Sequence, residues 1–397
     1  MKSWRQALTY NVIILSLASL LNDVSSEMII PLLPFFFLSL QANVLVIGLV
    51  EGVAEAVVSG VRVLSGHRSD ETGLRKRFIS AGYGLSAAAK GLLAFATVWP
   101  HILAARVGDR LGKGVRDPSR DALIADSAPP ESRGTAFGFH RAMDTTGAVI
   151  GPIVAFAFIA AGVAVNTVFL VAAIPAIGAF AITLLVRERR RAPERRPLFG
   201  SLASLPAPLR RYLVVAALFS TGNMAVSLVL LRGCTLSLGA NACDTVEGIP
   251  LTIALYVAFN VVYAILSLAA GRLSDRVGRR PMVLAGYAAV GMVLALFAVT
   301  GLPLLVLFLL LGVGYALVDG SQRALVVDLA PAERKGLSLG TYHGISAATR
   351  LASGILAGAL WVAVSPEAAF FAGGALALSA AALLPWALPT TRTPLPT

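Results

Sequence analysis

The chain has 397 residues, of which 57% are hydrophobic and only 14% are charged, and its mean hydropathy is +0.78. Soluble domains carry about 25% charged residues, so this composition excludes a water-soluble protein and leaves no room for a soluble catalytic domain. The net charge of +12 would suit nucleic-acid binding, but the basic residues fall in alternate loops, which argues against that function and for an oriented membrane protein.

Twelve apolar segments are predicted along the chain, because roughly 20 apolar residues cross about 30 Å of hydrocarbon. They cover approximately residues 8–39, 44–65, 76–97, 99–126, 134–160, 165–187, 209–231, 249–271, 281–300, 303–328, 336–361 and 366–387. The first reads as a retained span, since no cleavage site follows a short apolar core. The one long connection, residues 188–208, is rich in arginine and proline and is expected to be a cytoplasmic linker.

This pattern predicts an all-α polytopic membrane protein, with one six-helix bundle over residues 1–187 and a second over 209–397. Lysine and arginine lie in the predicted inside loops, whereas the outside loops hold only Arg232. By the positive-inside rule, both termini are expected in the cytoplasm, with the protein in the cell inner membrane.

The two cysteines of the chain, Cys234 and Cys243, lie in the same predicted outside loop. An oxidising compartment would permit a disulfide between them, and two free thiols are the alternative. Metal ligation is not expected, because nothing nearby completes a ligand set.

Two motifs occur twice in the chain, about 200 residues apart, which indicates two related halves. The first is GHRSDETGLRKR at residues 66–77, which corresponds to GRLSDRVGRR at residues 271–280. The second is ALIADSAPPESRG at residues 122–134, which corresponds to ALVVDLAPAERKG at residues 324–336.

Over its whole length the sequence resembles the major facilitator superfamily, whose loop between spans 2 and 3 reads G-x-x-x-D-[RK]-x-G-[RK]-[RK]. The second copy matches fully, through Gly271, Asp275, Arg276, Gly278 and Arg279. The first copy matches at Gly66, Asp70, Gly73 and Arg75, but it has Glu71 in place of the basic residue and one extra position. The resemblance implies that Asp70 and Asp275 latch the cytoplasmic side. A turn that only fixes topology is the alternative.

The predicted fifth span contains Gly147, Gly151 and Pro152, similar to the G-x-x-x-G-P motif that the superfamily associates with exporters that exchange substrate for protons. Two glycines one turn apart allow close helix packing, and the proline bends the helix. The resemblance favours the drug:proton antiporter-like branch.

Ionisable groups inside the membrane cost at least about 2.5 to 3.5 kcal/mol each, so they persist mainly where they are paired or functional. Asp23 and Glu27 share one face of the first span, while Arg106 and Arg110 share one face of the fourth, with Lys113 beside Arg110. The resemblance implies that Asp23 and Glu27 carry protons with Arg110 as partner and Arg106 as a rival partner. A permanent structural salt bridge is the alternative, and which carboxylate carries the proton stays open.

Further polar residues in predicted spans are candidates for the substrate cavity. They are Glu51, Glu55, Arg141, Asn223, Tyr256, Asn260, Tyr263, Asp319 and Arg350. Tyr256, Asn260 and Tyr263 form one helical stripe, which either lines a cavity or packs against other helices. His140 is expected to be a helix-packing residue, and Lys90 of the third span is expected at the periphery.

These features predict a secondary transporter that is driven by a proton gradient and needs no cofactor or metal. Its partners are the lipid bilayer, protons and a small molecule, and we expect a monomer. The leading hypothesis is efflux of an amphipathic or xenobiotic compound by alternating access. A carrier of an anionic metabolite or siderophore is the rival, and a non-transporting membrane sensor is a remote alternative. Substrate, transport direction and stoichiometry stay open.

Overall fold

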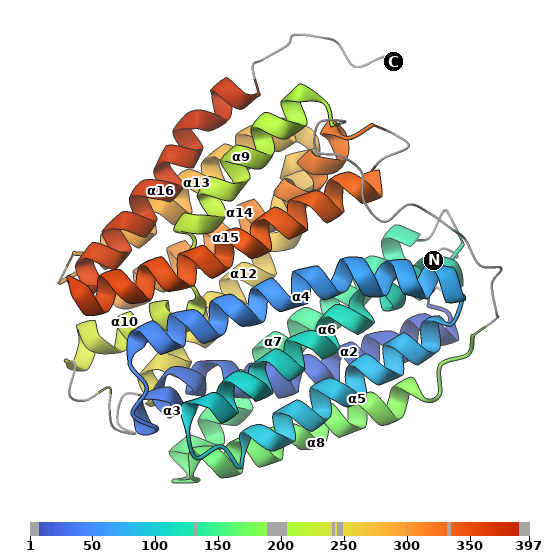
Figure 1. Cartoon of the computed structure of the whole chain (residues 1–397), viewed down its shortest axis with the longest axis horizontal. Helices are drawn as coiled ribbons and strands as arrows, with labels where there is room; N and C mark the ends of the chain where they lie inside the picture. Colours follow the sequence, from blue (N-terminus) through green and yellow to red (C-terminus); the bar gives the residue numbers. More distant parts are fainter. Residues whose placement is uncertain are drawn as a thin grey trace. The chain divides into compact units, whose positions relative to one another are not determined.

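A computed structural model describes residues 8–129, 133–188, 205–239, 243, 249–299, 301–331 and 335–388 (Figure 1). Within these ranges the regular structure is helical and no strand is present. Ten helical segments there are long and apolar enough to cross a membrane. The predicted third and fourth spans are also helices, but their charged residues keep them out of that set.

The first half of the chain follows the predicted order. Its helices are α2 (Tyr10–Ile29), η1 (Ile30–Leu32), α3 (Leu33–Ser39), α4 (Val44–Thr72), α5 (Arg75–Leu93), α6 (Trp99–Ser127), α7 (Arg133–Ala160) and α8 (Val165–Thr183). The predicted first span is divided into α2, η1 and α3 at Pro31 and Pro34, because a proline removes a helical hydrogen bond. Asn43 caps α4 by accepting a hydrogen bond from the Val46 amide at 3.1 Å.

The second half shows one break that the sequence did not predict. Its helices are α9 (Ala207–Gly222), α10 (Val226–Leu238), α12 (Ile249–Val277), α13 (Arg279–Phe297), α14 (Leu304–Leu329), α15 (Lys335–Ala363) and α16 (Pro366–Ala387). The predicted seventh span is α9 plus α10, separated by residues 223–225. Asn223 and Ala225 have extended backbone there, with ψ of 100° and 138°.

The chain forms two compact units, one of residues 1–198 with 225–260 and one of residues 199–224 with 261–397. The segment 225–260 therefore belongs with the first unit, because α10 packs on η1, α3 and α4. The predicted division into bundles 1–187 and 209–397 differs in this segment and stays a prediction.

Close helix packing in the first unit depends on small residues. A Cβ on Gly82 of α5 would lie 2.5 Å from the Gly112 carbonyl of α6, and a Cβ on Gly112 would lie 2.5 Å from the Gly82 carbonyl. These two glycines let the backbones of α5 and α6 touch. α2 packs against α7 and α8, and an apolar core that includes Val12, Leu15 and Tyr83 holds α2 to α5.

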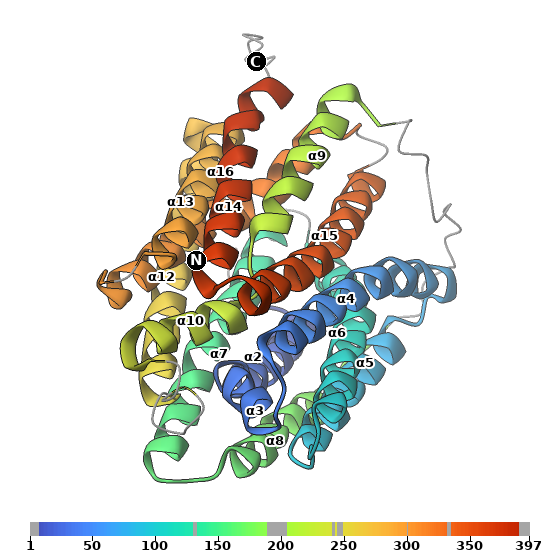
Figure 2. The ribbon, with the colours of Figure 1, turned by 60° about the vertical axis from the view of Figure 1, so that its left-hand side comes forward.

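In the second unit, α13 packs against α14 and α16, and α16 also packs against α9. Figure 2 shows α16 beside α9 and α13 from a second direction. Gly222 of α9 and Gly373 of α16 allow the same kind of contact, since a Cβ on Gly222 would lie 2.6 Å from the Gly373 carbonyl. The rings of Phe219 and Tyr287 stack at 3.9 Å between centroids.

Candidate functional site

The candidate site starts from the acidic turn of α2, which we define as Asp23 and Glu27. Both side chains are half-buried. The turn lies against α7: a Cβ on Gly147 would lie 2.9 Å from the Asp23 Cβ, and a Cβ on Gly151 would lie 2.7 Å from the Glu27 Cβ. The glycines of the predicted antiporter-type motif are thus the residues that admit the two predicted proton carriers.

Glu27 has one hydrogen-bond partner in the described part of the chain. The Tyr256 hydroxyl of α12 donates to Glu27 Oε2 at 2.6 Å, and Tyr256 itself is 4% exposed. Asn260 donates to the Tyr256 carbonyl at 3.1 Å, one turn back on the same helix, and Tyr256 is the member of the predicted stripe that contacts the acidic turn. For Asp23 the nearest donor is the Asn22 amide at 3.5 Å. No cation among the described residues forms an ion pair with Asp23 or Glu27.

A ladder of ion pairs joins α4 to α6. Arg106 donates to Glu51 through Nε at 3.1 Å and Nη2 at 2.8 Å, and both residues are buried. The same ladder continues with Glu55 to Arg110 at 3.4 Å and Arg62 to Asp117 at 2.7 Å. All three pairs are 55 residues apart in sequence, which means that α4 and α6 run parallel and in register.

Arg110 was predicted as the partner of Asp23 and Glu27. Its ion pair in this structure is with Glu55, because the common register of α4 and α6 places that carboxylate directly opposite. Its role toward the two carboxylates of α2 stays a prediction. Arg106, the rival partner, is held by Glu51. Glu51 therefore lies inside an ion pair, and its place in the substrate cavity stays a prediction.

Lys113 of α6 remains as a cation near the acidic turn. It is half-buried and forms no ion pair with any described residue. Its charge lies within electrostatic reach of both Asp23 and Glu27, as do the charges of Arg110 for Glu27 and of Arg116 and Arg120 for Asp23.

Lys90 was expected at the periphery, and this prediction is wrong. It is 2% exposed, because the tight packing of α5 on α6 turns its face of α5 inward. Its ammonium donates to the carbonyl and the side-chain oxygen of Asn22 at 3.1 and 3.0 Å. One signal could have found it: Lys90 lies near the predicted outer end of a span, where the positive-inside pattern otherwise excludes lysine.

His140 and Arg141 of α7 differ in their surroundings. His140 is buried, with Nε2 at 3.8 Å from Asp144 Oδ1 on the same helix, in line with the expected packing role. Arg141 is exposed.

The remaining predicted cavity residues lie in the second unit. Tyr263 of α12 donates to Asp319 of α14 at 2.9 Å, and Asp319 also pairs with Arg323 at 2.6 Å. Tyr315 donates to the Asn223 side chain beside the break that follows α9. These bonds connect α12 to α14 and α14 to the end of α9. Arg350 of α15 is exposed.

Comparison with known proteins assigns the family. The model of the Major Facilitator Superfamily matches residues 15–241 and 245–397. The chain belongs to this superfamily. An uncharacterised MFS-type transporter of Methanocaldococcus jannaschii is 34% identical over 381 residues, which cover 95% of this chain and 94% of the relative. The multidrug resistance protein MdtH of Aeromonas salmonicida is 29% identical over 140 residues, 35% of either chain.

The fold agrees with that assignment. The crystal structure of the nucleoside transporter NupG superposes with a TM-score of 0.77 and covers 95% of this chain and 99% of its own, at 12% identity. At that identity the likeness concerns the fold alone. The predicted all-α fold of the Major Facilitator Superfamily is therefore confirmed, and the chain is a multi-pass member of a family of transporters.

The superfamily loop motif forms the same ion pair in each half. Arg75 pairs with Asp126 in the first copy, and Arg279 pairs with Asp328 at 3.5 Å in the second. Each pair connects the two motifs that the sequence repeats. The side chains of Asp70 and Asp275 lie outside the described part of the chain, so their latch role stays a prediction.

The glycines of these loops have different environments. Gly73 ends α4 in the left-handed region with φ of 63°, and Gly278 precedes α13 with φ of 100°. Both conformations favour glycine. A Cβ on Gly66 would meet Pro118 at 3.2 Å, whereas a Cβ on Gly271 would meet nothing within 4 Å. Arg276 of the second copy is exposed.

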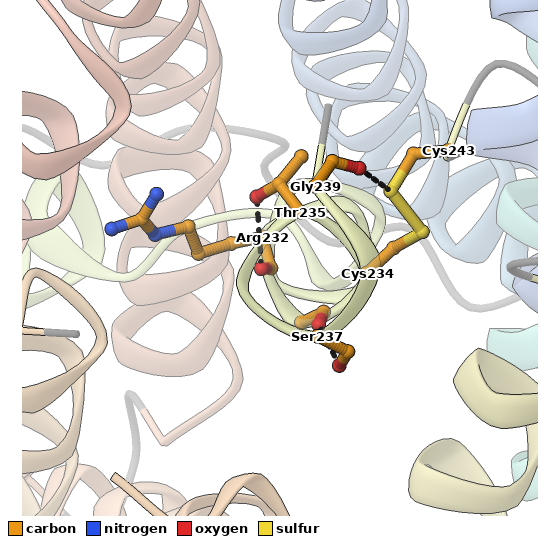
Figure 3. Close-up of a disulfide and its surroundings, with 7 residues drawn as sticks. Arg232, Cys234, Thr235, Ser237, Gly239 and Cys243 are labelled. Carbon is orange, nitrogen blue, oxygen red and sulfur yellow. Dashed lines mark hydrogen bonds between the residues drawn. A yellow bond between two sulfur atoms is a disulfide. The ribbon is translucent and has the colours of Figure 1, made fainter. Parts of the chain in front are cut away.

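Cys234 and Cys243 form a disulfide, with their Cα atoms 5.9 Å apart (Figure 3). Of the two possibilities that the sequence left open, the structure has the disulfide. Both residues are buried, and Cys243 Sγ also lies 3.3 Å from the Gly239 carbonyl. Figure 3 shows Arg232 on the opposite side of α10, where it is 4% exposed. The bond closes a short loop at the end of α10.

Proposed function

We propose that this transporter exports a small amphipathic compound in exchange for protons by alternating access, with Asp23 and Glu27 as the proton-carrying groups. The observation that carries the proposal is the acidic turn itself. Two carboxylates lie one helical turn apart in a membrane-spanning helix, and neither forms an ion pair with a described residue. A carboxylate without a permanent counter-ion is free to bind and release a proton as its surroundings change.

The α4 to α6 ladder supports this assignment by contrast. Glu51, Glu55 and Asp117 each have an arginine within 3.4 Å, so their negative charges are compensated. Such a carboxylate is already ionised, and its arginine opposes the binding of a proton. The acidic turn is the place in α2, α4 and α6 where gain and loss of a proton would change the charge balance.

Tyr256 links the acidic turn to α12. Its hydroxyl donates to Glu27 Oε2 at 2.6 Å. A substrate that takes the place of the hydroxyl on the Glu27 carboxylate would need that carboxylate ionised, whereas a proton bound there would neutralise it. Substrate and proton would then compete for the same group, which is what exchange of substrate for protons requires.

The export direction and the class of compound rest on two further points. Gly147 and Gly151 carry the antiporter-type pattern and touch the acidic turn. The multidrug resistance protein MdtH is similar over 140 residues. Of the α6 cations that could attract an anionic substrate, Arg106 and Arg110 are neutralised by Glu51 and Glu55. Lys113 is left, and the carboxylates of the acidic turn oppose its charge. We further propose the cell inner membrane as location, with both termini cytoplasmic.

The test uses purified protein in proteoliposomes with ethidium as an amphipathic cation and carboxyfluorescein as an anion. An imposed proton gradient is expected to drive ethidium uphill in the wild type, and Glu27→Gln or Asp23→Asn is expected to abolish ethidium-driven proton movement. Glu367→Gln, the same chemical change in the first turn of α16, is the matched control and should behave as wild type. Unchanged coupling in both acidic-turn variants, or transport of carboxyfluorescein alone, would refute the proposal.

A further inference from the structure

Lys90 is a buried cation to which the function proposed above gives no role. It lies in the last turn of α5 and is 2% exposed. Burying an ammonium among membrane helices is costly unless it is paired or functional. Its surroundings therefore need an explanation.

The Lys90 ammonium connects three helices. It donates to the main-chain oxygen and the side-chain oxygen of Asn22 on α2, and it lies 3.8 Å from Asp109 Oδ1 on α6. Asn22 is 1% exposed and Asp109 is 5% exposed, so water does not weaken these contacts. The two bonds to Asn22 are shorter than the distance to Asp109. The closest partner of the cation is thus a neutral residue of α2.

Asn22 directly precedes Asp23 in the sequence. Successive residues of an α-helix point about 100° apart, so Asn22 and Ser26 form one face of α2 while Asp23 and Glu27 form the next. The first face meets Lys90, and the second meets Gly147 and Gly151 of α7. A bond that fixes Asn22 therefore fixes the rotation of the acidic turn.

A small cavity lies beside these contacts, between α2, α5 and α6. Its polar lining consists of Ser26, Lys90, Arg106 and Asp109. The charged groups that act on Lys90 are Asp109, Arg116 and Arg110 from α6 and Asp23 from α2.

We propose that Lys90 is a positioning residue: through Asn22 it clamps α2 to α5 and α6 and holds Asp23 and Glu27 in place against α7. The importance of Lys90 for transport rests on the proposed function of the acidic turn. The clamp between Lys90 and Asn22 does not depend on that function. The alternative is that Lys90 serves only as counter-ion to Asp109. The two roles differ in which residue Lys90 acts through, and this can be measured.

The first readout is amide hydrogen exchange of residues 20–28 in the full-length protein in nanodiscs. Lys90→Met removes both hydrogen bonds to Asn22 and is expected to raise exchange in this segment about tenfold or more. Asn22→Ala removes only the bond to the side-chain oxygen and is expected to raise exchange less. The double variant Asn22→Ala/Lys90→Met should equal Lys90→Met alone, because Lys90→Met already removes both bonds to Asn22. Lys90→Arg should stay close to wild type.

The variant Lys90→Met/Asp109→Asn separates the two roles. This variant removes both buried charges. If Lys90 served only as counter-ion to Asp109, no unpaired charge would remain, and amide exchange would return to the wild-type rate. The clamp predicts that exchange stays raised, since Asn22 still lacks its donor. Wild-type exchange in this double variant would overturn the proposal. Should Lys90→Met fail to fold, this double variant still decides.

The second readout is ethidium-driven proton movement in proteoliposomes. Lys90→Met is expected to slow it about tenfold, in line with loss of a charged hydrogen bond, and Glu27→Gln serves as reference. If Glu27→Gln retains coupling, the proposed function fails, while the exchange experiment still decides the clamp. If Glu27→Gln abolishes coupling and Lys90→Met does not alter it, the positioning role fails and the proposed function stands.

Discussion

The contact between α2 and α7 can be tested by adding a single methyl group. In Gly151→Ala, the new Cβ would lie 2.6 Å from the Val24 carbonyl oxygen and 2.7 Å from the Glu27 Cβ. Neither atom is the end of a flexible side chain, so the helices must separate. Restoring an ordinary contact of 3.4 Å requires a movement of about 0.8 Å.

Overpacking of this kind costs about 1–3 kcal/mol. We therefore expect Gly151→Ala to lower the free energy of unfolding by that amount, as measured by SDS titration in mixed micelles. We also expect reduced ethidium-driven proton movement, because Glu27 moves away from Tyr256. Gly147→Ala should have a similar effect, since its Cβ would lie 2.7 Å from the Leu20 carbonyl oxygen.

Gly138→Ala is the matched control, because Gly138 lies in the same helix and a Cβ there would meet nothing within 4 Å. Alanine is a better helix former than glycine, so this variant should be as stable as wild type or more stable by up to about 1 kcal/mol. If Gly151→Ala matched Gly138→Ala in stability, the reasoning on α2 and α7 would be refuted.

Three further predictions concern other parts of the chain. Arg106→Met should destabilise the protein by about 3–5 kcal/mol, because it leaves the buried Glu51 carboxylate without its partner. Glu51→Leu/Arg106→Met should regain most of this loss. Equal stability of the single and double variants in SDS titration would contradict the prediction. Cys234→Ser should cost about 2–3 kcal/mol by opening a loop with a separation of 9 residues, and alkylation followed by mass spectrometry should find no free thiol on Cys234 or Cys243 in the wild type. Gly278→Ala should cost about 1–3 kcal/mol, since φ of 100° with ψ of 154° is strained for alanine, and an unchanged melting temperature would argue against it.

Much of the fold follows from local sequence signals. Hydropathy predicts the spans, because inside a membrane the backbone N–H and C=O groups must hydrogen-bond to one another, and a helix does this within one segment. The repeated motifs predict the two related halves. The break between α9 and α10 escaped prediction, since Asn223 lies in an apolar run without proline. What holds that break are contacts distant in sequence: Tyr315 and Ser353 both donate to Asn223. The hydropathy of a segment does not depend on contacts with distant residues, so it could not predict this break.

The candidate site was predicted in part. The four-residue spacings correctly placed Glu51 with Glu55 and Arg106 with Arg110 on shared helix faces, but spacing within one helix does not select the opposite helix. Several carboxylates could serve Arg110, and only the register of α4 against α6 decides for Glu55. Lys90 was missed for the same reason, since its partner Asn22 is 68 residues away in the chain.

The most direct test of proton exchange at the acidic turn is the proton count on ligand binding. Purified protein in weakly buffered detergent solution is mixed with tetraphenylphosphonium, an amphipathic cation, and the change in pH is recorded. Exchange predicts that the wild type releases protons and that Glu27→Gln releases fewer or none. Equal release by both proteins, or uptake of protons on binding carboxyfluorescein with no response to the cation, would contradict the account.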